Sequence, residues 1–155
     1  MNAAARISSA ASTPAAAFPL VGGVRLGKFE IVRELASGGM GRIYVARDTL
    51  TNVEVALKVL LPVVNAEPGR LDRFKRESLI CQQLNHPNVV RIYDIGEDQG
   101  YYFISMELLR GRDLRTWLDE DPHPDLAQVC ALGLQMLAGI AAAHAHGVVH
   151  RDFKP

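Results

Sequence analysis

The first half of the chain alternates apolar and polar residues, which is the period-two pattern of half-buried β-strands. It predicts two strands around a glycine cluster, at 29–35 and 43–45, and a third strand at 53–60. The third strand would place its apolar side chains on one face and the others on the opposite face: Val53, Val55, Leu57 and Val59 against Glu54, Ala56 and Lys58. Two more apolar segments, 89–95 and 101–108, flank a loop suited to a hairpin. The pattern therefore predicts five antiparallel strands.

Spacings of three and four between apolar residues predict three helices. The first runs through 71–84 and carries Glu77 on its apolar stripe, and the second is short and follows Asp113, a residue type that caps helices. The third, 125–146, ends before Gly147, a typical terminating residue. Because the strands, with one helix, precede a mainly helical part instead of alternating with helices, we expect an α+β fold in two lobes.

Composition narrows the class of protein. The chain has 155 residues, 48 % of them hydrophobic, which supports a folded core and excludes disorder throughout. Its 17 basic and 17 acidic residues leave no charge excess for binding nucleic acid. Two cysteines are too few for a secreted disulfide scaffold, so we expect a reducing, cytoplasmic location. No run approaches the roughly 18 consecutive apolar residues of a membrane span, so no membrane segment is predicted.

The N-terminal segment differs in composition from the rest of the chain. Residues 1–19 are rich in alanine, with serine, threonine and proline, and the first acidic residue is Glu30. We predict a flexible extension over 1–25, followed by a folded domain over 28–155. A transit peptide is the weaker alternative, because Arg6 is the only basic residue before Arg25.

A glycine cluster lies between the first two predicted strands, at Gly38-Gly39-Met40-Gly41. Glycine at such a place lets backbone N–H groups approach a phosphate closely. A plain hairpin turn would require the same residues, so the cluster alone does not decide between the two.

Two charged residues occupy positions that are otherwise apolar. Lys58 lies inside an apolar strand, which a lysine extending from a sheet edge would also explain. Glu77 lies on an apolar helix stripe, where a carboxylate without a partner is costly to bury, and a local contact with Arg73 would not explain its inward position. An ion pair between Lys58 and Glu77 accounts for both charges.

The most specific string is the last one, His150-Arg151-Asp152-Phe153-Lys154-Pro155. It follows, in this order, Gly38-Gly39-Met40-Gly41-Arg42-Ile43-Tyr44, Val55-Ala56-Leu57-Lys58, Arg76-Glu77 and Asn85-His86-Pro87-Asn88. With these motifs the chain resembles the N-terminal half of a serine/threonine protein kinase domain of the bacterial type. The resemblance implies a kinase fold, with a five-stranded N-lobe and one helix at 28–108, then a hinge and the start of a truncated helical C-lobe at 109–155.

The resemblance also implies an ATP site in the first lobe. Lys58 would hold the α- and β-phosphates and would itself be held by Glu77. The loop over the phosphates would contain Gly38, Gly39 and Gly41, and the apolar roof over adenine would contain Ile43 and Ala56.

The same resemblance places the adenine edge and the ribose after the last strand of the sheet. Met106 matches the gatekeeper position, so the backbone of Glu107 and Leu109 would meet adenine. Asp113 matches a residue that reaches the ribose, and a simple helix cap at Asp113 is compatible with that role.

The catalytic residues that the resemblance implies lie at the C-terminus. Asp152 matches the aspartate that orients the substrate hydroxyl and accepts its proton, and Lys154 matches the lysine that reaches the γ-phosphate in serine/threonine kinases. Arg151 implies an activation segment organised by a phosphate–arginine pair. The implied activity is ATP-dependent phosphoryl transfer, with Mg²⁺, to serine and threonine hydroxyls of a protein substrate that the sequence does not identify.

Two departures from the family pattern affect these expectations. Ala36 replaces the first glycine of the loop. The asparagine and the Asp-Phe-Gly motif that hold Mg²⁺ in the family are absent from the sequence, so we expect the 155-residue chain by itself to be inactive. His144, His146 and His150 could suggest a metal site, but no cysteine or carboxylate completes a tetrahedral set, and packed histidines are the favoured interpretation.

Two alternatives stay open. The first is a non-catalytic nucleotide-binding or scaffold module, similar to a pseudokinase fragment. The second is a remnant that does not fold stably, because helix 125–146 would expose its apolar face.

Overall fold

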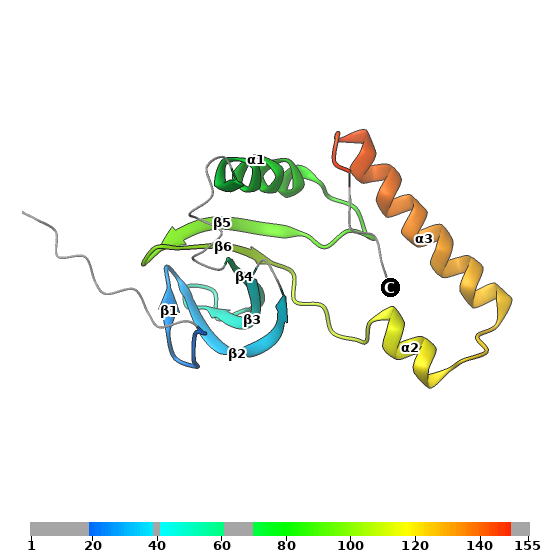
Figure 1. The fold of residues 1–155 in the computed structure, drawn as a ribbon, viewed down its shortest axis with the longest axis horizontal. Helices are drawn as coiled ribbons and strands as arrows, with labels where there is room; N and C mark the ends of the chain where they lie inside the picture. Colours follow the sequence, from blue (N-terminus) through cyan, green and yellow to red (C-terminus); the bar gives the residue numbers. More distant parts are fainter. Residues whose placement is uncertain (1–18, 39–40, 61–69, 150–155) are drawn as a thin grey trace, which may run out of the picture.

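The computed structural model describes residues 19–38, 41–60 and 70–149, without the side chains at 70–75 and 77. Six strands form one antiparallel sheet in the order β1-β2-β3-β4-β6-β5. Their bounds are β1 Arg25–Leu26, β2 Phe29–Gly38, β3 Gly41–Asp48, β4 Glu54–Leu60, β5 Ile92–Asp98 and β6 Tyr101–Met106. The helices are α1 Arg70–Gln83, α2 Leu114–Glu120 and α3 Leu126–Ala145. Figure 1 shows a curled sheet with α1 over β5, and with α2 and α3 together on one side of it.

The arrangement confirms the predicted α+β class, but the sheet has six strands where five were predicted. The additional strand is β1, which pairs Arg25 with Glu30 and Leu26 with Phe29 of β2. A strand of two residues is too short to show a period-two pattern, so the hydrophobic pattern could not reveal it.

The core of the sheet lies on the face predicted for the third strand. Val55, Leu57 and Val59 of β4 are buried in one cluster, together with residues from the other strands. The prediction is wrong for Val53, because this residue precedes β4 and is 56 % exposed. The remaining members of the cluster are Leu20, Leu26, Phe29, Ile31, Tyr44, Ala46, Tyr101 and Phe103.

Residues 19–24 are here called the N-terminal strap. They were predicted to belong to a flexible extension, but in the structure they pack against the sheet. Leu20 is 4 % exposed, and the Gly23 N–H donates to the Ile31 carbonyl at 2.8 Å. The Ile31 N–H in turn donates to the Val24 carbonyl at 2.8 Å. The strap therefore continues the edge of the sheet before β1, because Leu20 and Val24 have apolar surface to bury in the core.

The β5–β6 hairpin differs from its prediction only in its bounds. β5 begins at Ile92 and not at Val89, because the Val89 N–H is used in a turn with the His86 carbonyl. The hairpin turns at Gln99 and Gly100, whose φ angles are 52° and 78°. Two consecutive residues with positive φ give the chain reversal whose twist suits two antiparallel strands.

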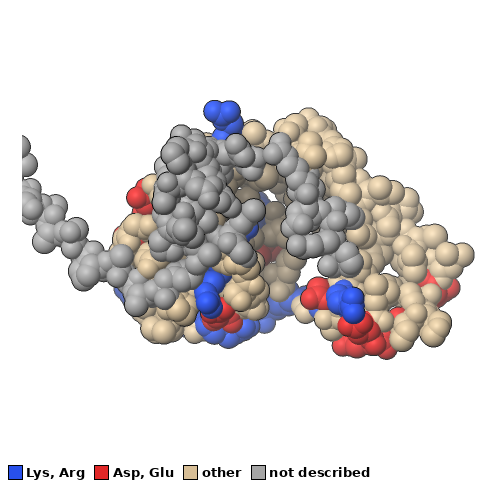
Figure 2. All heavy atoms as spheres, viewed as in Figure 1, with Lys and Arg blue, Asp and Glu red and all other residues tan. Residues whose placement is uncertain are grey.

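α3 has the predicted bounds within one residue. The Asp125 backbone N–H donates to Gln128 Oε1 at 3.2 Å at its start, and Gly147 has a φ of 74° just after its end. No Lys, Arg, Asp or Glu occurs in the helix, which Figure 2 shows as an uncharged stretch beside the charged α2. Among the residues that the structure describes in α3, only Gly139 is buried.

α3 bears on the expectation that the chain has no membrane segment. Its 20 residues include a window of mean hydropathy 1.7, enough to span a membrane by length and composition. Gln128 and Gln135 interrupt the apolar run, so a count of consecutive apolar residues overlooked it. A single helix of this kind is weak evidence for a membrane span, because core helices of soluble proteins have the same composition.

The loop after α1 contacts α3 near Gly139. A Cβ on Gly139 would lie 2.8 Å from the Asn88 carbonyl oxygen, so the two backbones are in close contact. The Asn88 side chain donates to Gln135 Oε1 at 3.2 Å, one turn earlier on the same helix. This contact joins the sheet part of the chain to its helical part.

Candidate active site

The register of the sheet brings four of the predicted site residues onto one face. Lys58 of β4 lies opposite Ile43 of β3, and Ala56 lies opposite Met106 of β6. Residues that oppose each other in antiparallel strands project from the same face. Leu57 lies between Lys58 and Ala56 and projects into the core, so these four side chains lie on the opposite face.

This face is mainly apolar around Lys58. Ala56 is 6 % and Ile104 is 7 % exposed, and Ile104 lies directly opposite Lys58 on β6. Lys58 and Met106 are half-buried. A single ammonium group on an apolar surface is suited to attract a phosphate, because little competing polar surface surrounds it.

Several of the predicted site residues lie outside the described part of the chain. These are Gly39, Asp152 and Lys154. Glu77 lies in α1, which packs against β5, but its side chain is among those not described. The Lys58–Glu77 ion pair therefore stays a prediction.

The two described glycines of the loop differ in their surroundings. They oppose each other in the β2–β3 register. Among the described residues, a Cβ on Gly38 would meet no atom within 4 Å, whereas a Cβ on Gly41 would overlap the Val59 carbonyl oxygen and lie 3.2 Å from Leu60 Cα. Gly38 thus leaves space on the surface, and Gly41 allows β3 to lie close to β4. Ala36, at the position of the missing glycine, is exposed and keeps its pairing with Ile43.

The segment after β6 offers backbone groups suited to an adenine ring. The Glu107 N–H donates to the Arg91 carbonyl at 2.9 Å. Within the described residues, neither the Glu107 carbonyl nor the Leu109 N–H takes part in a hydrogen bond. One free acceptor and one free donor, two residues apart, match an adenine edge, which presents both an amino group and a ring nitrogen.

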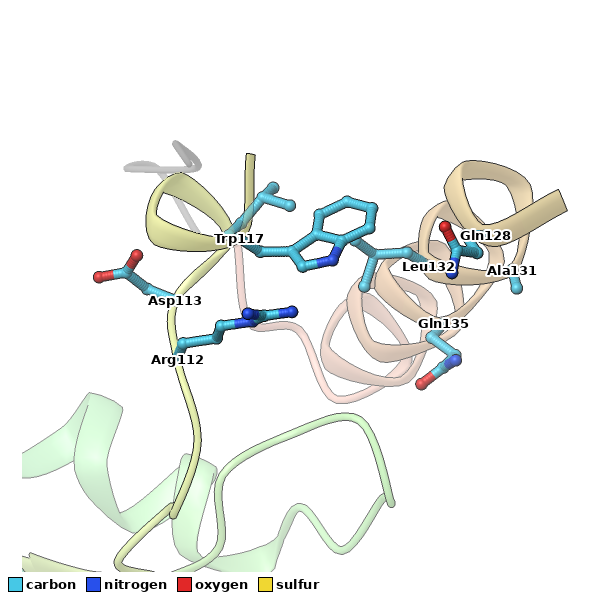
Figure 3. Close-up of a pocket in the computed structure, with 8 residues that line it drawn as sticks. Arg112, Asp113, Trp117, Gln128, Ala131, Leu132 and Gln135 are labelled. Atoms are coloured by element: carbon cyan, nitrogen blue, oxygen red, sulfur yellow. The ribbon is translucent and has the colours of Figure 1, made fainter. Parts of the chain in front are cut away.

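Asp113 is a helix cap in the structure. Its Oδ1 accepts a hydrogen bond from the Thr116 N–H at 2.7 Å, and this bond lowers the pKa of the Asp113 carboxyl. It borders a pocket of about 460 Å³ between α2 and α3. Figure 3 shows Trp117 and Arg112 pointing toward α3 across this pocket, with the Asp113 carboxylate pointing away. Lys58 is not among the residues that line it, so contact between Asp113 and a ribose stays a prediction.

An ion pair near the loop end of the β2–β3 hairpin was not predicted from the sequence. Arg42 Nη1 lies 2.8 Å and 2.7 Å from the two carboxylate oxygens of Glu34. Glu34 opposes Tyr44, a core residue, so the pair lies on the face opposite Lys58. The only signal in the sequence was one acidic and one basic residue on either side of the glycine cluster.

Comparison with known proteins identifies this arrangement. The family profile described as "Protein kinase domain" matches residues 29–155. The chain belongs to the protein kinase domain family. This kinase domain sequence is 39 % identical over 129 residues to serine/threonine-protein kinase pkn2 of Myxococcus xanthus, covering 83 % of this chain and 15 % of that protein. It is 35 % identical over 136 residues to serine/threonine-protein kinase PrkC of Bacillus subtilis, covering 88 % and 21 %.

Solved structures confirm the predicted kinase-like fold. The kinase domain of PknI from Mycobacterium tuberculosis superposes with a TM-score of 0.77 at 30 % identity, covering 89 % of this chain and 57 % of that domain. The chain therefore spans little more than half of a solved kinase domain, and 15 % and 21 % of the two curated relatives. In the described part of this kinase domain, no group of three or more His, Cys, Asp or Glu residues could hold a metal ion.

Proposed function

We propose that this chain supplies the ATP-binding part of a serine/threonine protein kinase, which transfers the γ-phosphoryl group of ATP to serine and threonine hydroxyls of protein substrates. The observation that supports it best is the shared sheet face of Lys58, Ile43, Ala56 and Met106. Two of the similar proteins are named serine/threonine-protein kinases, pkn2 and PrkC, and these names agree with the proposed reaction.

Each part of the site would have its own task. Adenine would lie against Ala56 and Ile43, with its polar edge at the Glu107 carbonyl and the Leu109 N–H. The Lys58 ammonium would then neutralise phosphate charge, and Gly38 would leave room for the phosphates under the loop. Because phosphoryl transfer requires mainly positioning and charge stabilisation, these contacts account for much of what this part of the enzyme must do.

The remaining tasks fall to residues outside the described part. Asp152 would orient the substrate hydroxyl and accept its proton, and Lys154 would contact the γ-phosphate. Bound Mg²⁺ would neutralise the charge on the phosphates during transfer. We also propose a cytoplasmic location for this domain, which the two free cysteines and the use of ATP support.

Binding of MgATP to the 155-residue chain, measured by calorimetry, is the direct test. Binding is the more direct readout than turnover, because the chain spans 57 % of a solved kinase domain. Lys58→Met should abolish or strongly weaken it, since removing a charged hydrogen-bond donor to a phosphate costs about 1.5–3 kcal/mol, or roughly 10- to 150-fold in affinity. Arg115→Met is the matched control, because Arg115 is an exposed cation on α2.

Equal loss of affinity in both variants, or no MgATP binding by the wild-type chain, would contradict the proposed nucleotide site. Transfer of labelled phosphate to a generic protein substrate by the whole protein would decide between a kinase and a non-catalytic nucleotide-binding module.

A further inference from the structure

The N-terminal strap packs on the face of the β2–β3 hairpin that lies away from Lys58. Its anchor is Leu20, which is 4 % exposed and belongs to the same buried cluster as Tyr44. The Leu20 N–H donates to the Tyr44 hydroxyl at 3.1 Å, across 24 residues of sequence. Tyr44 is fully buried, and burial raises the pKa of its hydroxyl. The hydroxyl is therefore a neutral acceptor that holds the strap in place.

The strap contacts both strands of the hairpin that carries the glycine-rich loop. It contacts β3 through Tyr44. It contacts β2 at Ile31, whose carbonyl accepts from the Gly23 N–H and whose N–H donates to the Val24 carbonyl. Tyr44 lies three residues after Gly41, so the anchor is about 10 Å along the strand from the loop. The strap thus fastens the base of the hairpin.

The strap contacts matter for the position of the hairpin, because the hydrogen-bond register between β2 and β3 is irregular. The register between β2 and β3 shifts twice before the loop, between Ile31 and Arg33 and between Glu34 and Ala36. Each irregularity interrupts the hydrogen-bond ladder and bends the strand. The position of the loop is therefore not determined by a continuous ladder from the base of the sheet.

The two faces of β3 connect the strap to the nucleotide site. Tyr44 projects into the core, and its neighbour Ile43 projects from the other face, opposite Lys58. A shift of β3 at Tyr44 must therefore shift Ile43 and the loop above the nucleotide. We propose that Leu20 and Tyr44 are positioning residues for the nucleotide site, and that the docked strap sets the height of the glycine-rich loop over ATP. This proposal rests on the proposed ATP site.

The experiment compares variants of the 155-residue chain by two readouts. The first is hydrogen exchange of the β2 and β3 amides, which needs no nucleotide, and the second is MgATP affinity by calorimetry. In Leu20→Ala and Tyr44→Phe we expect β3 amides to exchange about tenfold faster, because the strap loses its apolar anchor or its acceptor. We expect MgATP affinity to fall by about three- to tenfold, although neither residue lies on the nucleotide face.

Three controls separate positioning from simple loss of stability. Val21→Ala alters the same strap at a side chain that is 67 % exposed, and it should change neither readout. Leu26→Ala removes the same number of atoms from the same core, at a residue outside the strap, and should lower stability without changing MgATP affinity. Leu20→Met keeps the apolar volume, so its β3 amide exchange and its MgATP affinity should both stay near the wild-type values.

The outcomes are distinguishable. If Leu26→Ala weakens MgATP binding as much as Leu20→Ala does, or if β3 exchange is unchanged in Leu20→Ala, the positioning role is wrong. If the wild-type chain binds no MgATP, the proposed function fails. In that case faster exchange in Tyr44→Phe but not in Val21→Ala still supports the strap as the fastening of the hairpin, and unchanged exchange overturns it.

Discussion

Replacing Gly41 with alanine should destabilise the sheet, whereas replacing Gly38 should not. The two glycines oppose each other at the end of the same hairpin. A Cβ on Gly41 would overlap the Val59 carbonyl oxygen and lie 3.1 Å from the Val59 carbonyl carbon, and both are backbone atoms that no rotamer change can move aside. A Cβ on Gly38 would have no atom of the residues that the structure describes within 4 Å.

These surroundings set the expected magnitudes. Forcing a methyl group into a filled space costs about 1–3 kcal/mol, so Gly41→Ala should lower the free energy of unfolding by that amount. Gly38 has no positive φ, so alanine fits its backbone and should raise stability by about 0.4–1 kcal/mol by restricting the unfolded chain. The two substitutions thus have opposite signs, although both replace a glycine of one motif.

Urea unfolding followed by far-ultraviolet circular dichroism measures the difference, with MgATP affinity as a second readout. We expect Gly41→Ala to lower both stability and affinity, and Gly38→Ala to lower affinity only, because its Cβ occupies space intended for phosphate. A Gly41→Ala chain as stable as wild type would refute the packing role of this glycine. A Gly38→Ala chain with unchanged affinity would refute the role of its open space.

Three further substitutions test other parts of the chain. Gly96→Ala would place a Cβ against the Phe103 ring and should lower the free energy of unfolding by about 1–3 kcal/mol in urea. Asp48→Ala removes the acceptor of two backbone N–H groups and should cost about 1–3 kcal/mol in the same assay. The Thr116 N–H lowers the pKa of Asp113, so its cap should stabilise α2 fully above about pH 4 and be lost as pH falls further. The single tryptophan of the chain lies on α2, so its fluorescence measures the loss of α2 structure as pH falls. Asp113→Ala should remove this pH dependence.

Each of these expectations has an outcome that contradicts it. An unchanged urea midpoint in Gly96→Ala would mean that the Phe103 ring can move aside. An unchanged midpoint in Asp48→Ala would mean that the backbone N–H groups near Asp48 find other acceptors. Tryptophan fluorescence with the same pH dependence in Asp113→Ala as in wild type would mean that another group titrates.

The sheet could be predicted well where its residues alternate regularly. The apolar face of β4 was correct from Val55 to Val59, because a strand buried on one side must alternate. The strap was not predictable, because Leu20 and Val21 are two adjacent apolar residues with no alternation, and the burial of Leu20 depends on the distant Tyr44. Isolated residues carry no periodicity, and contacts across 24 residues of sequence leave no local pattern.

The candidate site was predictable through motifs more than through pattern. Lys58 could be identified from the sequence as a charge in an apolar strand, but its place opposite Ile43 depends on the register between β3 and β4, which no spacing along the chain reveals. The Glu107 N–H donates to the Arg91 carbonyl, whereas the Glu107 carbonyl has no hydrogen-bond partner among the described residues, and both facts depend on tertiary structure. The site residues could therefore be identified from the sequence, whereas the structure was needed to show which of their backbone groups can bind a ligand.

The contact between Asn88 and Gly139 limits how the two parts of the chain can move. Because no side chain separates the two backbones there, the loop lies as close to α3 as atomic radii allow. The adjacent hydrogen bond from Asn88 to Gln135 keeps the loop from lifting away. Any movement that separates the loop from α3 would have to break this hydrogen bond, so the contact favours movements of the sheet part that pivot near Asn88.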